Sequence, residues 1–323
     1  MTGKVSENWD MYWRGGGDGA AYNCDGISHP AVRAFWMDCF DGVRVDLAAP
    51  RIVDVASGNG AVAEYAQAAF EGLPDLTCLD VSASAIAALR ERFPAADAIV
   101  ADAAAIPLAS AAFDVVTSQF GVEYAGLDAI DEVARLAAVG GRLALLMHHR
   151  GGSIYRECSA GADAIERMRE SGFIPRAAAM FETGFAACRG ADRAPYDAAA
   201  AELAPAVREL EAIMTAHGMR VAGGLVARLY DDVATVHEGI AQYEPSEVLA
   251  WLDRLDVETR AFRGRMAAMC DAAVDADAFR GLCARLQGHG FRLLQADGLA
   301  AADVSLPLAW RLLAVRERTR EPD

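Results

Sequence analysis

The sequence lacks the features of a nucleic-acid-binding or membrane-inserted protein. It contains no run of five or more basic residues, and the formal net charge of its 323 residues is −16. A duplex binder needs a footprint of Lys and Arg, so nucleic acid and acidic membrane surfaces are disfavoured as partners. No apolar run approaches the roughly 18–20 residues of a membrane span. The N-terminal stretch has no apolar signal-peptide core, so we expect a cytoplasmic protein.

Neither a disulfide framework nor a metal site can be recognised. The seven cysteines are odd in number and widely spaced, and no C-x-x-C pair occurs. This pattern indicates free thiols in a reducing compartment. The histidines and carboxylates show no metal-ligand spacing, so we expect no metal. Internal repeats are also absent. With 54% hydrophobic and 24% charged residues, the chain is instead typical of a globular protein with a sizeable core.

Short apolar runs alternate with helical patterns from Arg51 to His149. We expect strands at 51–56, 76–81, 98–103, within 113–121 and at 142–149, and helices at 61–70, 82–93 and 127–141. Strands that alternate with helices of ten or more residues favour βαβ units. These strands are apolar throughout, as expected for a parallel sheet that is covered on both faces.

The pattern changes after His149. Residues 151 to about 275 show helical periodicity and no convincing strand, and one of these helices is expected to begin at Pro205 and end at Gly218. A helix over 275–290 follows. Two apolar runs, at 291–299 and 307–318, are expected to rejoin the sheet.

The resulting prediction is an α/β fold, a doubly wound and mostly parallel seven-stranded sheet with a helical cap insertion. We expect three parts. These are an N-terminal helical lid segment over 1–44, a cofactor-binding core over 45–150 and 276–323, and a helical cap or substrate insertion over 151–275.

Residues 51–66, RIVDVASGNGAVAEYA, predict a strand, a glycine-rich turn and the start of a helix. Such turns bind nucleotides because glycine allows positive φ and the backbone N–H groups face the ligand. The stretch from Gly58 to Ala63 satisfies G-x-G-x-x-A, and Asp80 lies 20 residues beyond Gly60, where it can accept hydrogen bonds from a ribose. The turn alone leaves NAD and S-adenosylmethionine both open.

Three features favour S-adenosylmethionine. Asp54 lies inside the first strand, where its carboxylate would disfavour a pyrophosphate and favour an α-ammonium group. Asp102 closes the third strand and can accept from an adenine amine. Only five βα repeats precede the helical segment, which leaves little room for the nicotinamide half of a dinucleotide-binding sheet.

These residues resemble those of the class I S-adenosylmethionine-dependent methyltransferases, of the small-molecule type related to quinone-biosynthesis methyltransferases. The resemblance covers roughly 45–149 and 277–318. The family's turn, acid-x-Gly-x-Gly-x-Gly, corresponds to Asp54, Ala56, Gly58 and Gly60. It implies a Rossmann-like fold and S-adenosylmethionine as cofactor, with S-adenosylhomocysteine as product.

The resemblance also implies roles for individual residues. Asp80 would contact the ribose, Asp102 and Ala103 the adenine, and the end of the fourth strand the region of the methyl group. The predicted cofactor-binding residues are Trp13, Asp54, Ala56, Ser57, Gly58, Asn59, Gly60, Asp80, Val81, Asp102, Ala103, Ser118, Gln119 and Phe120.

Candidates for the chemistry lie at the ends of the fourth and fifth strands. His148 and His149 end the fifth strand, and the carboxyl ends of parallel strands line the ligand crevice, so one of them could take a proton from the acceptor. Glu123, just past the fourth strand, is a third catalytic candidate. The predicted substrate-binding residues are Tyr12, Tyr124, His148 and His149.

An aromatic cluster, Trp9, Tyr12 and Trp13, precedes the segment RGGGDG. One interpretation is a helix that pins the N-terminus to the core. The other is a lid whose aromatic faces approach the sulfonium cation and whose glycines act as a hinge.

The predicted function is methyl transfer from S-adenosylmethionine to a small or medium-sized organic acceptor. The alternatives are a peptide or protein methyltransferase, a non-catalytic partner subunit that binds the cofactor, and an NAD-dependent oxidoreductase. A homodimer is compatible with the sequence. The identity of the acceptor and of the atom that is methylated does not follow from it.

Overall fold

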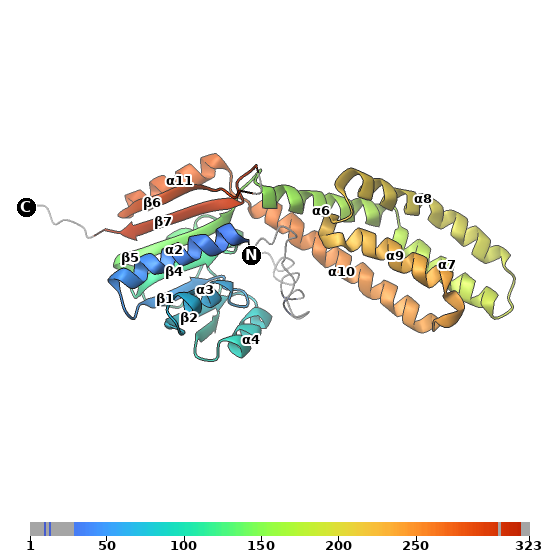
Figure 1. Ribbon diagram of the computed structural model, residues 1–323, viewed down its shortest axis with the longest axis horizontal. Coiled ribbons are helices and arrows are strands. Elements are labelled where there is room, and N and C mark those ends of the chain that lie inside the picture. The colour runs from blue at the N-terminus through green and yellow to red at the C-terminus, as the bar shows by residue number, and fades with distance from the viewer. Residues whose placement is uncertain (1–9, 11–12, 14–28, 303–304, 318–323) are drawn as a thin grey trace, which may run out of the picture. The chain divides into compact units, whose positions relative to one another are not determined.

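The computed structural model describes residues 10, 13, 29–302 and 305–317. The chain divides into two compact units, one made of residues 1–156 and 268–323 and the other of residues 157–267. Figure 1 shows a sheet with flanking helices in the first unit and long helices in the second. No helix among the described residues is long and apolar enough to cross a membrane.

The first unit contains the predicted seven-stranded sheet, in the order β3-β2-β1-β4-β5-β7-β6. Neighbouring strands from β3 to β5 pair in parallel, whereas β7 runs antiparallel to both β5 and β6. The predicted late strands therefore do rejoin the sheet. The strands are β1 (Arg51–Val55), β2 (Asp75–Asp80), β3 (Asp97–Val100), β4 (Phe113–Gln119), β5 (Ala137–His148), β6 (Phe291–Leu299) and β7 (Ala309–Arg316).

Helices cover both faces of this sheet, which explains why its central strands are apolar throughout. Over residues 29–156 and 268–302, the helices of the first unit include α2 (Pro30–Asp46), α3 (Ala61–Ala69), α4 (Ala83–Arg92), the 3₁₀ helix η1 (Val122–Ala125), α5 (Ala129–Ala134) and α11 (Ala276–Gly288). On one face, Trp36 of α2 donates to Gln119 of β4. On the other, Phe279 of α11 stacks on Trp310 of β7, with ring centroids 4.3 Å apart.

Helix α2 corrects part of the predicted lid segment. It falls almost wholly within residues 1–44, yet its apolar side chains are buried and Trp36 and Phe40 are fully so. Arg142 of β5 donates to the carbonyl of Gly42 in this helix at 2.8 Å. Residues 30–46 are therefore a core helix of the first unit, because their apolar stripe is needed to cover the sheet.

The third predicted helix is wrong in length. We predicted helix over 127–141, but α5 ends at Ala134 and β5 already begins at Ala137. Ala137 pairs with Phe113 of β4, and the amide groups of Ala112 and Phe113 donate to the carbonyl of Leu136. Pairing with β4 thus overrides the helical propensity of this Ala-rich stretch.

The second unit is all helical. Its elements are α6 (Ser153–Glu170), α7 (Phe173–Cys188), α8 (Ala194–His217), η2 (Val221–Gly224), α9 (Leu225–Glu238), η3 (Ile240–Gln242) and α10 (Pro245–Ala272), with α6 beginning and α10 ending in the first unit. It has its own apolar core, which includes Phe173, Phe181, Leu210 and Ile213.

Helix α8 ends at the predicted Gly218 but begins well before the predicted start, since Pro205 lies inside it. A proline in a helix leaves a carbonyl of the preceding turn without its usual partner. The carbonyl without its partner here is that of Ala201, four residues before Pro205, and both residues are exposed. The helix tolerates the proline because solvent can satisfy that carbonyl.

Candidate functional site

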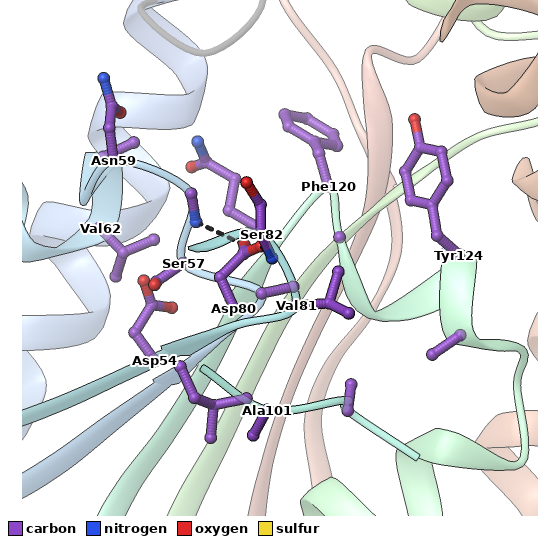
Figure 2. Close-up of a pocket in the computed structure, with 18 of the residues that line it drawn as sticks. Asp54, Ser57, Asn59, Val62, Asp80, Val81, Ser82, Ala101, Phe120 and Tyr124 are labelled. Atoms are coloured by element: carbon purple, nitrogen blue, oxygen red, sulfur yellow. Dashed lines mark hydrogen bonds between the residues drawn. The ribbon is translucent and has the colours of Figure 1, made fainter. Parts of the chain in front are cut away.

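A pocket opens at the carboxyl edge of the parallel strands of the first unit (Figure 2). Ligands bind at this edge in open α/β sheets, because the strand ends and the following loops converge there. The pocket is lined by Trp13, Asp54, Ala56, Ser57, Gly58, Asn59, Ala61, Val62, Leu79, Asp80, Val81, Ser82, Ala101, Asp102, Ala103, Gln119, Phe120, Gly121, Tyr124 and Ala125.

All the predicted cofactor-binding residues line this pocket except Gly60 and Ser118. Gly60 precedes α3 with φ 94°, and a Cβ there would lie 2.7 Å from the Phe93 ring, so it shapes the turn rather than the pocket wall. Ser118 is fully buried within β4, and its hydroxyl has no hydrogen-bond partner among the described residues.

The glycine turn contains a residue that departs from the expected chemistry. Ala56 has φ 55°, a left-handed conformation that normally selects glycine, and Gly58 has φ 54°. Gly121, which follows β4, compensates for the extra side chain. A Cβ on Gly121 would lie 2.5 Å from the Ala56 Cβ. The two strand ends can approach this closely only because one of the pair is glycine.

Asp54 places an unsatisfied carboxylate oxygen in the pocket. Its side chain is 1% exposed, and Thr117 of the neighbouring strand donates to Oδ1 at 2.8 Å. Oδ2 has no hydrogen-bond partner among the described residues. Burial raises the pKa of Asp54 to about 7, an effect that the Thr117 hydrogen bond opposes and the charge of Asp80 reinforces. Oδ2 is therefore suited to a cationic partner.

Asp80, at the end of β2, is held by the backbone of the two neighbouring turns. The amide of Gly58 donates to Oδ2 at 2.9 Å and the amide of Ser82 to Oδ1 at 2.8 Å (Figure 2). Burial raises the pKa of the Asp80 carboxyl, and these backbone hydrogen bonds oppose that rise. Each oxygen keeps lone pairs with which to accept from a ligand hydroxyl.

The loop that carries Asp102 is fixed by an ion pair. Arg135 donates to the carbonyls of Ile106 and Leu108, both at 2.7 Å, and to Glu132, which accepts from the Ile106 amide at 3.0 Å. The Arg135 hydrogen bond lowers the pKa of Glu132, so this carboxyl is ionised at neutral pH. Asp102 itself accepts from the Ala104 amide at 3.0 Å.

The orientation of the Gln119 amide follows from its neighbour. The indole N–H of Trp36 lies 2.5 Å from Oε1 of Gln119. An indole nitrogen only donates, so the accepting atom must be the amide oxygen, and the NH₂ group of Gln119 remains as a donor at the pocket. Asp54 and Gln119 therefore present an acceptor and a donor from the same pair of strands.

Two N-terminal residues reach this edge of the sheet. A Cβ on Gly58 would lie 2.8 Å from the indole of Trp13, so this ring lies against the glycine turn. Asp10 accepts from the Ser82 hydroxyl at 2.8 Å and from the Ser84 amide at 3.3 Å, near the start of α4. Tyr12, a predicted substrate-binding residue, and Trp9 lie outside the described residues.

The pleat of β5 separates the two candidate histidines. His148 is fully buried and does not itself line the pocket, but its ring lies beside those of the lining residues Phe120 and Tyr124, with centroids 4.8 and 5.8 Å away. His149 stacks on Trp310 at 4.1 Å and does not line the pocket. The structure therefore does not bring His149 to the predicted catalytic and substrate site.

Glu123 also lies behind the pocket wall rather than in it. Its Oε1 accepts from the His148 backbone amide at 2.9 Å and lies 2.6 Å from His148 Nδ1. Tyr124, the next residue, lines the pocket as predicted, and Figure 2 shows it across from Asn59 and Val62, on the same side as Phe120.

Sequence reasoning missed several pocket residues, and only two of them had a signal that could have revealed them. Ser82 lies two residues after Asp80, the predicted ribose-binding residue, and Gly121 follows β4, so both are strand-end neighbours of predicted residues. The others are small or apolar side chains with no chemistry to mark them, namely Ala61, Val62, Leu79, Ala101 and Ala125.

Comparison with known proteins identifies the first unit. A family model described as a methyltransferase domain matches residues 53–145. The malonyl-[acyl-carrier protein] O-methyltransferase of Enterobacter lignolyticus is 36% identical over 96 residues, which are 29% of this chain and 37% of that protein. The ubiquinone/menaquinone biosynthesis C-methyltransferase of Cereibacter sphaeroides is 34% identical over 127 residues, 36% of this chain and 49% of that protein.

Solved structures are more distant. An amino-pentose methyltransferase from Micromonospora echinaspora, solved with S-adenosylmethionine bound, has 25% identity and a TM-score of 0.31, covering 37% of this chain and 52% of that one.

The chain spans between 37% and 49% of the length of these curated relatives, and the family model lies in the sheet-forming region. The predicted resemblance and fold class are confirmed. Residues 53–145 match the methyltransferase domain model, and the first unit has the predicted fold class of the class I S-adenosylmethionine-dependent methyltransferases.

Proposed function

We propose that this protein transfers the methyl group of S-adenosylmethionine to a small organic acceptor. The observation that carries the proposal is the buried carboxylate oxygen of Asp54, which has no hydrogen-bond partner among the described residues and lies in the pocket of a methyltransferase domain. A buried carboxylate without a partner is costly, so a cationic ligand group is its expected complement.

The described residues fit this cofactor along the whole pocket. Asp54 Oδ2 would accept from the α-ammonium group, and the Gln119 NH₂ group would donate to the carboxylate of the same amino-acid moiety. Asp80 would accept from the ribose hydroxyls. Asp102 would accept from the adenine amine, with the apolar Val81 and Ala101 available to flank the base.

The same residues argue against a dinucleotide. A pyrophosphate bound at the glycine turn would lie near Asp54 and Asp80, and both carboxylates would repel it. S-adenosylmethionine carries no phosphate, and its sulfonium and ammonium charges complement this acidic pocket. The charge of the pocket therefore supports the methyltransferase over the oxidoreductase.

The bound cofactor supplies an activated methyl group, so the work of the protein is mainly alignment. Holding the acceptor in line with the methyl carbon can contribute up to about 7–11 kcal/mol. Phe120 and Tyr124, which follow β4 in the chain, line one side of the pocket, and we assign the acceptor to that side. Their rings would exclude water from it.

By their names, the relatives act on different acceptors. One methylates a malonyl-[acyl-carrier protein], and the other is a C-methyltransferase of ubiquinone/menaquinone biosynthesis. The family model ends at residue 145, before the helical unit over 157–267 begins. We propose that this unit governs which acceptor is methylated. Replacing it with a short linker should abolish transfer but leave S-adenosylhomocysteine binding intact.

A transfer screen tests the proposed function. The full chain is incubated with S-adenosylmethionine labelled in its methyl group and with pools of phenols, carboxylic acids, carbon acids, thiols and amines, and labelled products are identified by mass spectrometry. Asp54→Asn is the inactive comparison. Label transferred by the wild type and not by the variant supports the proposal. Binding of NAD with no binding of S-adenosylhomocysteine would overturn it.

A further inference from the structure

The buried pair His148 and Glu123 lies beside the acceptor side of the pocket. Side chains alternate between the two faces of a strand, so residues an even number apart share a face. Arg142 of β5 donates a hydrogen bond to the Gly42 carbonyl of α2, so it lies on the face of the sheet that α2 covers. His148 lies six residues further along β5 and thus on the same face. Gln119 of β4 is also on this face, because it accepts a hydrogen bond from Trp36 of α2.

The strand β1 completes this arrangement. Asp54 of β1 accepts a hydrogen bond from the Thr117 hydroxyl of β4. Thr117 lies two residues before Gln119, so both residues, and Asp54 with them, are on the face covered by α2. The face covered by α2 therefore presents Asp54, Gln119 and His148 near the carboxyl ends of the neighbouring strands β1, β4 and β5. The order runs from the ammonium-binding carboxylate toward the side where we place the acceptor.

The tautomer of His148 is fixed by its contacts with Glu123. Oε1 of Glu123 accepts from the His148 backbone amide at 2.9 Å, and it lies 2.6 Å from Nδ1. Both oxygens of an ionised Glu123 can only accept, so Nδ1 then supplies the proton of the second hydrogen bond. A neutral imidazole protonated at Nδ1 has its lone pair on Nε2.

The carboxylate is also well placed to balance a positive charge on that ring. Glu123 is 4% exposed, and its Oε2 has no hydrogen-bond partner among the described residues. A buried carboxylate of this kind stabilises an imidazolium more strongly than water would, as in sites where an acid orients a histidine base.

Resting on the proposed function, we propose that His148 is the proton acceptor of the transfer and that Glu123 positions it. The acceptor is then a hydroxyl, a thiol or an acidic carbon, which loses a proton as it is methylated. The proton passes to Nε2, and the electron pair left on the acceptor atom forms the new bond to carbon. The electron pair of the broken sulfur–carbon bond stays on sulfur, and Glu123 balances the imidazolium.

The first test reads the histidine directly and needs no acceptor. The full chain with S-adenosylhomocysteine bound and its six histidines labelled with ¹⁵N is examined by long-range ¹H–¹⁵N NMR. His148→Gln and His149→Gln assign the two signals. We expect the His148 ring to be the tautomer with its proton on Nδ1 and its lone pair on Nε2. A ring protonated at Nε2, or at both nitrogens, would overturn the proposal.

The second test uses the acceptor that the transfer screen identifies. General-base catalysis contributes about 10²- to 10⁴-fold, so His148→Gln should lower kcat by that factor. His149→Gln is the matched control, since the same substitution one residue past the end of β5 should keep the wild-type rate. Glu123→Gln should lower kcat while the KM for S-adenosylmethionine stays unchanged.

A series of acceptor analogues of increasing acidity separates a proton-transfer role from a structural one. The loss caused by His148→Gln should shrink as the acceptor becomes more acidic, whereas a structural defect would lower all rates alike. Equal losses along the series, or methylation of an atom that bears no proton, would overturn the inference while leaving the proposed function intact. Failure to bind S-adenosylhomocysteine would instead defeat the proposed function itself.

Discussion

Replacement of Asp54 by asparagine tests how the buried carboxylate in the pocket contributes to stability and binding. In the protein without ligand, burial raises the pKa of Asp54 from 3.8 to about 7. Between these two values the folded protein holds a proton that the unfolded chain has released. The free energy of unfolding therefore falls as pH rises through this range.

The size of this effect follows from the shift. A difference of about three pKa units, at 1.36 kcal/mol each, corresponds to a loss of roughly 4 kcal/mol between pH 4 and pH 8. The asparagine side chain is neutral at every pH, so the Asp54→Asn variant should lack this slope. Its amide would place a buried donor where Oδ2 was, which costs about 1–3 kcal/mol independently of pH. The slope, and not the absolute stability, is thus the quantity to compare.

Native-state hydrogen exchange of the β1 amides measures the unfolding free energy of the sheet unit by itself. We expect the wild type to lose stability from pH 4 to pH 8 relative to Asp54→Asn. Asp114→Asn is the control, because Asp114 is a partly exposed carboxylate at the other end of the strand pair, bound to Arg51 at 3.3 Å. It should keep the wild-type slope.

The affinity for S-adenosylhomocysteine should depend on pH in the opposite direction to the free energy of unfolding. The ammonium of S-adenosylhomocysteine favours the ionised Asp54, so its affinity for the wild type should rise as pH increases through about 7. The affinity of Asp54→Asn should be lower and nearly constant over the same range. Identical pH slopes in wild type and variant, for exchange and for affinity, would refute the assignment of Asp54.

Two further predictions concern the glycine turn. Gly121→Ala should destabilise the sheet unit by about 1–3 kcal/mol, because its Cβ would lie 2.5 Å from that of Ala56, and adding Ala56→Gly should recover part of the loss. Denaturation of the wild type, the two single variants and the double variant measures the coupling free energy between the two positions. A coupling free energy of zero would argue against this contact. Trp13→Ala should weaken S-adenosylmethionine binding roughly 2- to 30-fold through loss of a cation–π contact with the sulfonium, with melting temperature unchanged. Unchanged affinity in calorimetry would remove Trp13 from the site.

The fold could be predicted from the sequence because each of its signals is local. Apolar runs and helical periodicity indicate most elements, and Ser82 and Asp275 cap two of the expected helices, α4 and α11. The boundary of α5 could not be predicted in this way. Leu136 and Ala137 read equally well as helix or strand, and pairing with β4, which is remote in sequence, decides between them.

The lining of the pocket at the glycine turn was predicted better than the arrangement of His148, His149 and Glu123. Asp54 and Asp80 follow from their places in a strand–turn–helix pattern, which the sequence displays. The choice between His148 and His149 depends on which face of β5 each occupies, and the contacts with Glu123 and Trp310 that reveal it come from distant segments. The compensation between Ala56 and Gly121 is likewise a contact across two strands.

Calorimetric titration of S-adenosylhomocysteine into the wild type and into Asp80→Ala tests the central claim most directly. A hydrogen bond to a charged group contributes about 1.5–3 kcal/mol, so we expect affinity to fall roughly ten- to over a hundred-fold in the variant. The variant should stay folded because Asp80 lies at the end of β2, and NAD should bind to neither protein. Equal affinity of the two proteins for S-adenosylhomocysteine, or binding of NAD alone, would contradict the assignment of this pocket.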